Sequence, residues 1–327
     1  GKPRSVSRLK YLGLLPFGGS VSSLINGKTE ILGVFGFPVG HSKSPTMHNA
    51  VCQKLGINAA YLPFSPNPEN FLSALDGLKA LHFRGANLTI PYKEKVLPYV
   101  QELSPISKFS GSVNTLYWKK SQNENVLCGT TTDPYGALKN MEEAGISVNG
   151  KSVALLGNGG AAKAIAFALL ENNANLSIIC RNLSRGNELA KNLSQYFQNK
   201  NIEVSEFCNF DSQKPDIILN TTPVGMFPNI NETPLPSASF RKEQFVYDII
   251  YTPKETRLLK EAKKAGCKTL NGEGMLVHQG AASFKLWFPK ETETISETFL
   301  VSIMREALQK ENSSEKISNS TPTSANI

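Results

Sequence analysis

A glycine-rich turn between a predicted strand and a predicted helix is the segment best suited to binding a phosphate group. The apolar run Val153–Leu156 predicts a buried strand, and Ala161–Glu171 predicts the helix after it. The turn itself reads Gly157-Asn158-Gly159-Gly160-Ala161. Backbone N–H groups of a turn without Cβ atoms approach a pyrophosphate closely, and the helix N-terminus adds its positive dipole end. Glycines also occur where a turn alone requires them, but the strand before this turn and the helix after it favour a dinucleotide-binding site.

The charge after the next predicted strand, Leu176–Cys180, indicates which dinucleotide binds. NAD sites place Asp or Glu about 20 residues beyond the first glycine, to bind the ribose 2′-hydroxyl. Here no acid follows Cys180; the residues are Arg181, Asn182 and, a little further, Arg185. Guanidinium groups bind a 2′-phosphate bidentately. We therefore expect NADP(H), the alternative being two ordinary surface arginines.

Other polar residues follow predicted strands or begin predicted helices. Ser42 and Ser44 stand at the start of a helix, where they suit either simple N-capping or a bound carboxylate. Lys93 follows a strand that ends in Asn87–Ile90, and Asn114 lies in Gly111–Thr115. Asp133 stands where the first half of the chain passes to the second.

Short apolar runs alternate with helical patterns through the first half of the chain. Strands are expected at 31–37, 60–64 and 83–90, and helices at 44–55 and 68–80. This β-α-β rhythm predicts a largely parallel sheet.

A second unit begins near Asp133 with a helix expected at 134–144. Besides the two strands around the glycine turn, strands are expected at 204–207, 216–220 and 245–250. After Gly272 the pattern is purely helical, at 274–288 and 296–309. The fold class is therefore α/β, with two domains as the default for 327 residues.

Composition narrows the class of protein. The formal net charge is +8, but no Lys/Arg run or basic stripe indicates nucleic-acid binding, so a small anionic ligand is the better explanation. No apolar run of 18 residues or more predicts a membrane helix. Five widely spaced cysteines and four histidines show no ligand spacing, which predicts reduced thiols, a cytoplasmic location and no metal site.

Several segments, taken in order, resemble the shikimate dehydrogenase family, whose members reduce 3-dehydroshikimate to shikimate with NADPH. The matching segments are Gly40–Pro45, Asn87–Lys93, Gly111–Thr115, Thr132-Asp133, Gly157–Ala161, Asn220–Met226, Tyr247–Pro253 and Met275–Gln279. They span about Ile31 to Gln309. Each is weak alone, whereas the ordered set is specific.

The resemblance implies a role for each matching residue. Lys93 and Asp133 would form the catalytic pair, with the Lys ammonium as proton donor to the forming alkoxide and Asp133 keeping it charged. Ser42 and Ser44 would bind the substrate carboxylate. The other substrate-binding residues would be Thr89, Asn114, Asp133, Tyr251 and Gln279. The cofactor would be held by Gly157, Asn158, Gly159, Gly160, Ala161, Cys180, Arg181, Asn182, Arg185, Ile249 and Gly272.

The resemblance also implies a substrate domain that is split around the cofactor domain. We expect a substrate-binding domain with a mostly parallel sheet at 31–133, a Rossmann-type NADP domain at 134–272, and C-terminal helices at 273–310 that return to the first domain. Residues 311–327 are rich in Asn, Ser and Thr and are expected to be a disordered tail.

Residues 1–30 lie outside the usual dehydrogenase. Ser7-Arg8-Leu9 and Phe17–Ser20 are similar to the end of type I dehydroquinate dehydratase, which is fused upstream of the dehydrogenase in some organisms. The segment is therefore either the end of such a fused module or an unrelated flexible linker.

Three departures from the family pattern stand out. Thr131 replaces the usual Asn before Thr132-Asp133, which removes a side-chain amide near the catalytic carboxylate. Cys180-Arg181-Asn182 replaces Asn-Arg-Thr, but the arginine that favours NADP is kept. Pro105 stands where the family often has an acid, so no role is expected of it.

Two alternative functions stay open from the sequence. One is a quinate/shikimate dehydrogenase that uses NAD or both cofactors, against which Arg181 argues. The other is a non-catalytic ligand sensor on the same fold, which would not need the pair Lys93 and Asp133.

Overall fold

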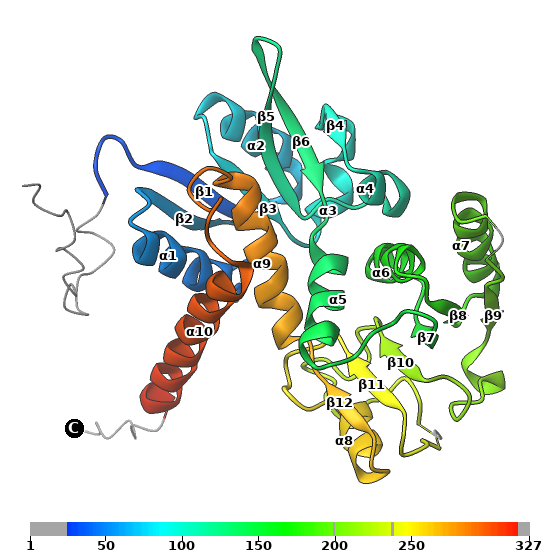
Figure 1. Ribbon diagram of the computed structural model, residues 1–327. Coiled ribbons are helices and arrows are strands. Elements are labelled where there is room, and N and C mark those ends of the chain that lie inside the picture. Colours follow the sequence, from blue (N-terminus) through cyan, green and yellow to red (C-terminus); the bar gives the residue numbers. More distant parts are fainter. Residues whose placement is uncertain (1–24, 199, 237–238, 320–327) are drawn as a thin grey trace, which may run out of the picture.

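The computed structural model describes residues 25–198, 200–236 and 239–319 of the chain. Two six-stranded sheets are arranged one beyond the other, and two helices, α5 (Asp133–Glu143) and α9 (Glu273–Trp287), run between them (Figure 1). The expected α/β class with two sheet-containing parts is confirmed.

The first sheet has the strand order β2-β1-β3-β5-β6-β4. Its strands are β1 (Glu30–Phe35), β2 (Ala59–Phe64), β3 (Gly85–Leu88), β4 (Glu102–Leu103), β5 (Thr115–Ser121) and β6 (Glu124–Thr130). Its helices are α1 (Ser44–Leu55), α2 (Phe71–Ala80), α3 (Tyr92–Lys95) and α4 (Pro105–Ser110), with 3₁₀ turns η2 (Pro68–Asn70) and η3 (Leu97–Tyr99).

This sheet is mixed, with three parallel and two antiparallel strand pairs. β1 pairs in parallel with β2 and β3, as the β-α-β rhythm predicts, and β4 is parallel to β6. The hairpin β5–β6 was not predicted, and it makes β3–β5 and β5–β6 antiparallel. The hairpin turns at Gln122, whose positive φ of 55° belongs to the left-handed region that tight turns use.

The two faces of the first sheet are covered by different helices. Leu32 and Val34 of β1 pack with Met47 of α1 and with α9 and α10 (Glu297–Asn319). Leu88 of β3 packs on the other face with α2, at Leu75. Burial on both faces explains why these strands read as nearly continuous apolar runs.

The second sheet is wholly parallel, with the order β12-β11-β10-β7-β8-β9. Its strands are β7 (Ser152–Leu156), β8 (Asn175–Ile179), β9 (Glu203–Ser205), β10 (Ile217–Asn220), β11 (Phe245–Asp248) and β12 (Lys268–Leu270). Its helices are α6 (Gly160–Glu171), α7 (Leu183–Tyr196) and α8 (Arg257–Lys264), with a 3₁₀ turn η4 (Phe207–Asn209). When the six strands are numbered in chain order within this sheet, their spatial order is that of the doubly-wound dinucleotide-binding fold. The direction in which successive strands are added reverses between β7 and β10.

Alternation along the strands builds a core on each face of this sheet. Val153 and Leu155 of β7 pack on the side of α5 and α6, whereas Ala154 and Leu156 pack on the side of α8. The reversal between β7 and β10 leaves a crevice at the carboxyl ends of these strands, which is where ligands bind in such sheets.

The helices α5 and α9 approach each other closely because Gly136 of α5 has no side chain. A Cβ atom at Gly136 would lie 2.6 Å from the carbonyl oxygen of Met275 and 2.9 Å from the backbone nitrogen of Gln279. The contact fixes the start of α5, which carries Asp133, against the turn of α9 that carries Gln279.

An ion-pair network joins the outer side of these helices to α10. His278 of α9 lies 3.1 Å from Glu143 of α5 and 3.3 Å from Glu297 of α10. Arg305 of α10 binds Glu143 bidentately and, as the largest cause, lowers the pKa of that carboxyl to about 2. The network therefore joins α9 to both α5 and α10.

The C-terminal helix is longer than expected. α10 runs to Asn319, so the expectation of a disordered tail from residue 311 is wrong for 311–319, and residues 320–327 lie outside the described part. Glu311 accounts for part of the extension, because it pairs with Lys43 and accepts a hydrogen bond from Thr46 of α1.

At the other end, residues 1–24 of the expected N-terminal extension also lie outside the described residues. The domain boundaries expected from the sequence stay a prediction.

Candidate active site

A cavity of about 180 Å³ lies between the two sheets. It is lined from the first part of the chain, from the loop after β11 and from α9. Ten of the residues expected at the site line it: Ser42, Ser44, Thr89, Lys93, Asn114, Asp133, Ile249, Tyr251, Gly272 and Gln279. A larger hollow of about 830 Å³, around Trp118 and Lys290, shares no residue with this cavity and holds no residue expected at the site.

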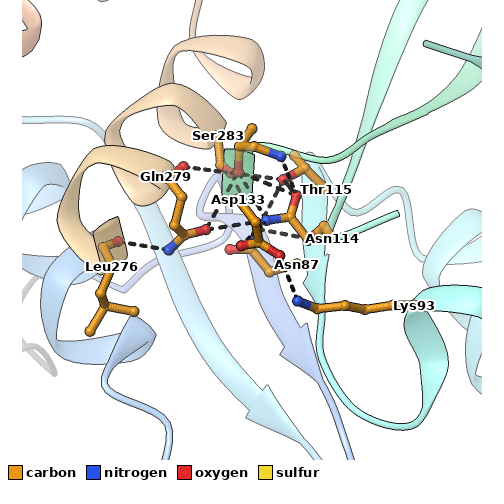
Figure 2. Close-up of polar contacts among 9 residues, drawn as sticks. Asn87, Lys93, Asn114, Thr115, Asp133, Leu276, Gln279 and Ser283 are labelled. Atoms are coloured by element: carbon orange, nitrogen blue, oxygen red, sulfur yellow. Dashed lines mark hydrogen bonds and ion pairs between the residues drawn. The ribbon is translucent and has the colours of Figure 1, made fainter. Parts of the chain in front are cut away.

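Lys93 and Asp133 form an ion pair in the cavity wall. Lys93 Nζ donates to Asp133 Oδ2 at 2.7 Å (Figure 2). Lys93 is delivered by the short helix α3, which follows β3, and Asp133 is the first residue of α5. The positive end of the α5 dipole stabilises the carboxylate. With side chains 31% and 22% exposed, the pair is open to a ligand and sheltered enough for charge to count.

Asn114 fixes the direction of the Asp133 carboxylate. Its Nδ2 donates to Asp133 Oδ1 at 2.9 Å, while its Oδ1 accepts the backbone N–H of Thr132 at 2.9 Å. The two oxygens of Asp133 are thereby divided between Asn114 and Lys93 (Figure 2). Although Thr131 replaces the family's asparagine, an amide from Asn114 still contacts the Asp133 carboxylate.

A buried polar hub beneath Asn114 was not predicted as part of the site. Asn87 of β3 accepts a hydrogen bond from Tyr61 at 2.7 Å and donates to the carbonyl oxygen of Asn114 at 3.0 Å. Ser283 of α9 lies 2.7 Å from Thr115, so the hub joins β3, β5 and α9 (Figure 2). Ser283 stands four residues after Gln279, and this helical spacing was the available sequence signal.

Gln279 reaches the cavity from α9. Its Nε2 donates to the carbonyl oxygen of Leu276 at 2.8 Å, and its Oε1 accepts from Asn114 at 3.4 Å. Its amide is therefore oriented before any ligand binds, which lowers the entropic cost of binding one.

The far end of the cavity carries hydroxyl groups at the start of α1. Ser42 Oγ accepts the backbone N–H of Ser44 at 3.3 Å, but the N-cap position of α1 is Lys43 and has no side-chain cap, so neither serine is the N-cap residue of the simpler interpretation. Both serines also line the cavity, beside Lys43. Burial raises the pKa of Tyr251, while the positive charges of Lys43 and Lys93 act against that rise.

The glycine turn after β7 fits a pyrophosphate. Gly157 has a φ of 110°, and a Cβ atom there would lie 3.0 Å from Thr221 Oγ1, at the point where the strand order reverses. Gly159 caps α6, and a Cβ atom there would meet open space. At Gly160, the first residue of α6, the nearest atom to a Cβ position is Glu94 Oε1 at 3.8 Å, so the backbone at the start of α6 is open to a ligand. Asn158 Nδ2 donates to the carbonyl oxygen of Asn182 at 3.3 Å and links this turn to the loop after β8.

The loop after β8 offers two exposed arginines for a 2′-phosphate. Arg181 and Arg185 are exposed at the start of α7, and Asn182 caps that helix by accepting the backbone N–H of Arg185 at 3.0 Å. The Cys180 side chain is buried instead, so close to Gly186 that a Cβ atom there would lie 2.6 Å from Cys180 Sγ. Of the residues expected around the phosphate, Cys180 therefore offers only its backbone.

Ile249 and Gly272 bring the crevice of the second sheet to the cavity. A Cβ atom at Gly272 would lie 1.8 Å from the carbonyl oxygen of Ile249, so only glycine permits this approach. Both residues also line the cavity. In the part of the chain that the structure describes, no group of three or more His, Cys, Asp or Glu residues could hold a metal ion. Over the same residues, no helix is long and apolar enough to cross a membrane.

Since the strand order reverses beside a cavity lined by a lysine–aspartate ion pair, the fold and the site define an oxidoreductase of the nicotinamide-dinucleotide class. The comparisons with known proteins identify the family. A family model described as the shikimate dehydrogenase substrate binding domain matches residues 34–116. A second, described as the shikimate 5′-dehydrogenase C-terminal domain, matches residues 272–291.

Similarity to individual proteins extends over most of the chain. The NADP⁺-dependent shikimate dehydrogenase of Methanococcus maripaludis is 42% identical over 266 residues, which are 81% of this chain and 94% of the relative. A shikimate dehydrogenase solved in complex with NADP⁺ is 38% identical, with a TM-score of 0.78 over 89% of this chain and 98% of that one. The shikimate 5-dehydrogenase from Listeria monocytogenes, solved with shikimate and NAD, is 34% identical, with a TM-score of 0.78 over 87% and 98%. The chain belongs to the shikimate dehydrogenase family.

Proposed function

We propose that this chain catalyses the reversible, NADPH-dependent reduction of 3-dehydroshikimate to shikimate. The observation that carries the proposal is the ion pair of Lys93 and Asp133, which faces a cavity bordered by Ile249 and Gly272. The family's two-part architecture and the arginines after β8 support NADP(H) as cofactor.

The cofactor, when bound, supplies the hydride that reduces the ring ketone. The chain's own residues stabilise and protonate the oxygen. Lys93 is placed to donate a hydrogen bond to the ketone and then a proton to the oxygen as negative charge develops on it. Asp133, which accepts from Lys93 at 2.7 Å, favours the charged ammonium before transfer and orients it.

The remaining residues orient the substrate. Ser42 and Ser44 offer hydroxyl groups to the carboxylate at the start of α1, and Tyr251 lies at the same cavity. Thr89, Asn114 and Gln279 offer polar groups to the ring hydroxyls. Fixing the ring from two sides places the ketone against Lys93, and this positioning contributes to the rate.

The test is oxidation of NADPH, followed by absorbance, with 3-dehydroshikimate and with 3-dehydroquinate as the matched control. We expect turnover with the first ketone, little with the second, and a lower kcat/KM with NADH than with NADPH. Equal turnover of both ketones would favour the quinate/shikimate alternative, and no turnover of either would favour a ligand sensor.

We propose further that the enzyme works in the cytoplasm, because all five cysteines are free thiols and four of them are buried. A covalent fusion to an upstream dehydratase module stays a proposal that rests on residues 7–9 and 17–20 alone. The full coding sequence upstream of residue 1 tests it.

A further inference from the structure

A lysine between the two serines also lines the substrate cavity. Lys43 stands at the N-cap position of α1, between Ser42 and Ser44, and its side chain is 24% exposed. Its charge acts on the Tyr251 hydroxyl, as the charge of Lys93 does. The cavity therefore has two cations in its lining, and only Lys93 is needed for proton transfer.

One partner of Lys43 comes from near the other end of the described chain. Glu311 Oε2 of α10 lies 3.3 Å from Lys43 Nζ, and Glu311 Oε1 accepts a hydrogen bond from Thr46 Oγ1 at 2.9 Å. Thr46 holds the carboxylate on α1 itself. The distance of 3.3 Å between Lys43 Nζ and Glu311 Oε2 exceeds the length of a strong charge-assisted hydrogen bond, which is about 2.7–2.9 Å. An ammonium group has three donors, so the contact with Glu311 does not by itself prevent Lys43 Nζ from donating to a second anion.

The neighbours of Lys43 suit one kind of second anion. Two serine hydroxyls and the positive end of the α1 dipole surround its backbone, and these are donors for a carboxylate. The substrate of the proposed function carries one carboxylate, on a different ring carbon from the ketone on which Lys93 must act.

We propose that Lys43 is a substrate-binding residue that supplies the positive charge of the carboxylate site, and that Glu311 partly neutralises Lys43 and so competes with the substrate carboxylate. The C-terminal helix thus regulates how strongly the site attracts an anion. This inference rests on the proposed function, because it takes the substrate to be a ring carboxylate.

The test compares Lys43→Met with Lys54→Met, which removes the same charge from an exposed position on the same helix. Steady-state kinetics are measured in the oxidation direction with NADP⁺, using shikimate and its uncharged methyl ester. For shikimate we expect Lys43→Met to raise KM about tenfold, equal to about 1.4 kcal/mol, with kcat changed less than twofold. For the ester the same substitution should change KM less than twofold, and Lys54→Met should change neither.

Glu311→Gln separates a binding role from a structural tether. It removes an anion that competes with the substrate, so we expect the KM for shikimate to fall two- to fivefold while Lys43→Met raises it. If both substitutions raise KM alike, or if Lys43→Met raises KM equally for acid and ester, Lys43 is only structural and the inference is overturned. If the parent enzyme oxidises neither compound, the proposed function fails first and the inference falls with it. A parent that is active on shikimate with an unchanged KM in Lys43→Met overturns the inference alone.

Discussion

Replacing Gly136 by alanine tests whether the contact between α5 and α9 positions the site. A Cβ atom at this position would meet the carbonyl oxygen of Met275 at 2.6 Å, and the backbone nitrogen and Cβ of Gln279 at 2.9 and 3.0 Å. These are largely backbone atoms of another helix, so no side-chain rotation relieves the overlap. The helices must separate by several tenths of an ångström.

The magnitude follows from two opposing effects. Overpacking of a close contact costs about 1–3 kcal/mol, and rigid backbone neighbours place this case at the upper end. Alanine in place of glycine within a helix stabilises by about 1 kcal/mol. The expected net loss is therefore about 2 kcal/mol, which for a chain of this size lowers Tm by roughly 3 °C. Because Gln279 moves with α9, KM for the substrate should rise while KM for NADPH stays nearly constant.

Gly77→Ala is the matched control for this substitution. Gly77 also lies within a helix, α2, but a Cβ atom there meets nothing within 4 Å. This variant should be more stable than the parent by about 0.5–1 kcal/mol and unchanged in KM. Thermal melts and steady-state kinetics of both variants decide the matter. A Gly136→Ala enzyme as stable as the parent, with an unchanged substrate KM, would refute the reasoning.

Two further predictions concern the cofactor and pH. Arg181→Ala should raise KM for NADPH at least fivefold and leave KM for NADH nearly unchanged, because only NADPH carries the 2′-phosphate; equal effects on both would contradict this role. Burial raises the pKa of Asp248 to about 6, although hydrogen bonds from Thr256, Ile250 and Asn220 favour its charged form. Since this lies above the unfolded value of about 3.9, the stability due to protonated Asp248 is complete below pH 4 and is lost as pH rises through 6. Asp248→Asn should therefore gain stability relative to the parent, by up to about 3 kcal/mol, between pH 4 and pH 7 in denaturant titrations; a constant difference would count against it.

The parallel strands and the glycine turn could be predicted because each is local in the sequence. A buried run such as Val153–Leu156 followed by Gly157 carries its own signal, and the resemblance to a family supplied Lys93 and Asp133. The structure brings Lys93 and Asp133 to one cavity, as expected. The roles of these residues stay predictions until variants are measured.

The elements that could not be predicted depend on contacts between distant segments. Asn87 is a polar residue inside a strand. Its hydrogen-bonding role is visible only in the folded structure, where the sheet brings Tyr61 and Asn114 next to it. In the hairpin β5–β6 the side chains change from buried to exposed toward the turn instead of alternating along each strand. The sequence therefore lacks the alternation of apolar and polar residues that predicts a half-buried strand. The helical extension past residue 310 depends in part on Glu311, which reaches α1 from 265 residues away.

The central claim is that Lys93 protonates the oxygen formed on the ketone. The most direct measurement is kcat for 3-dehydroshikimate at saturating NADPH in Lys93→Ala, beside Lys95→Ala, which removes an exposed lysine from the same short helix. The account predicts that Lys93→Ala lowers kcat by about 10²–10⁴-fold while the Kd for NADPH is unchanged, and that Lys95→Ala is close to the parent in both. Near-parental turnover in Lys93→Ala would contradict it.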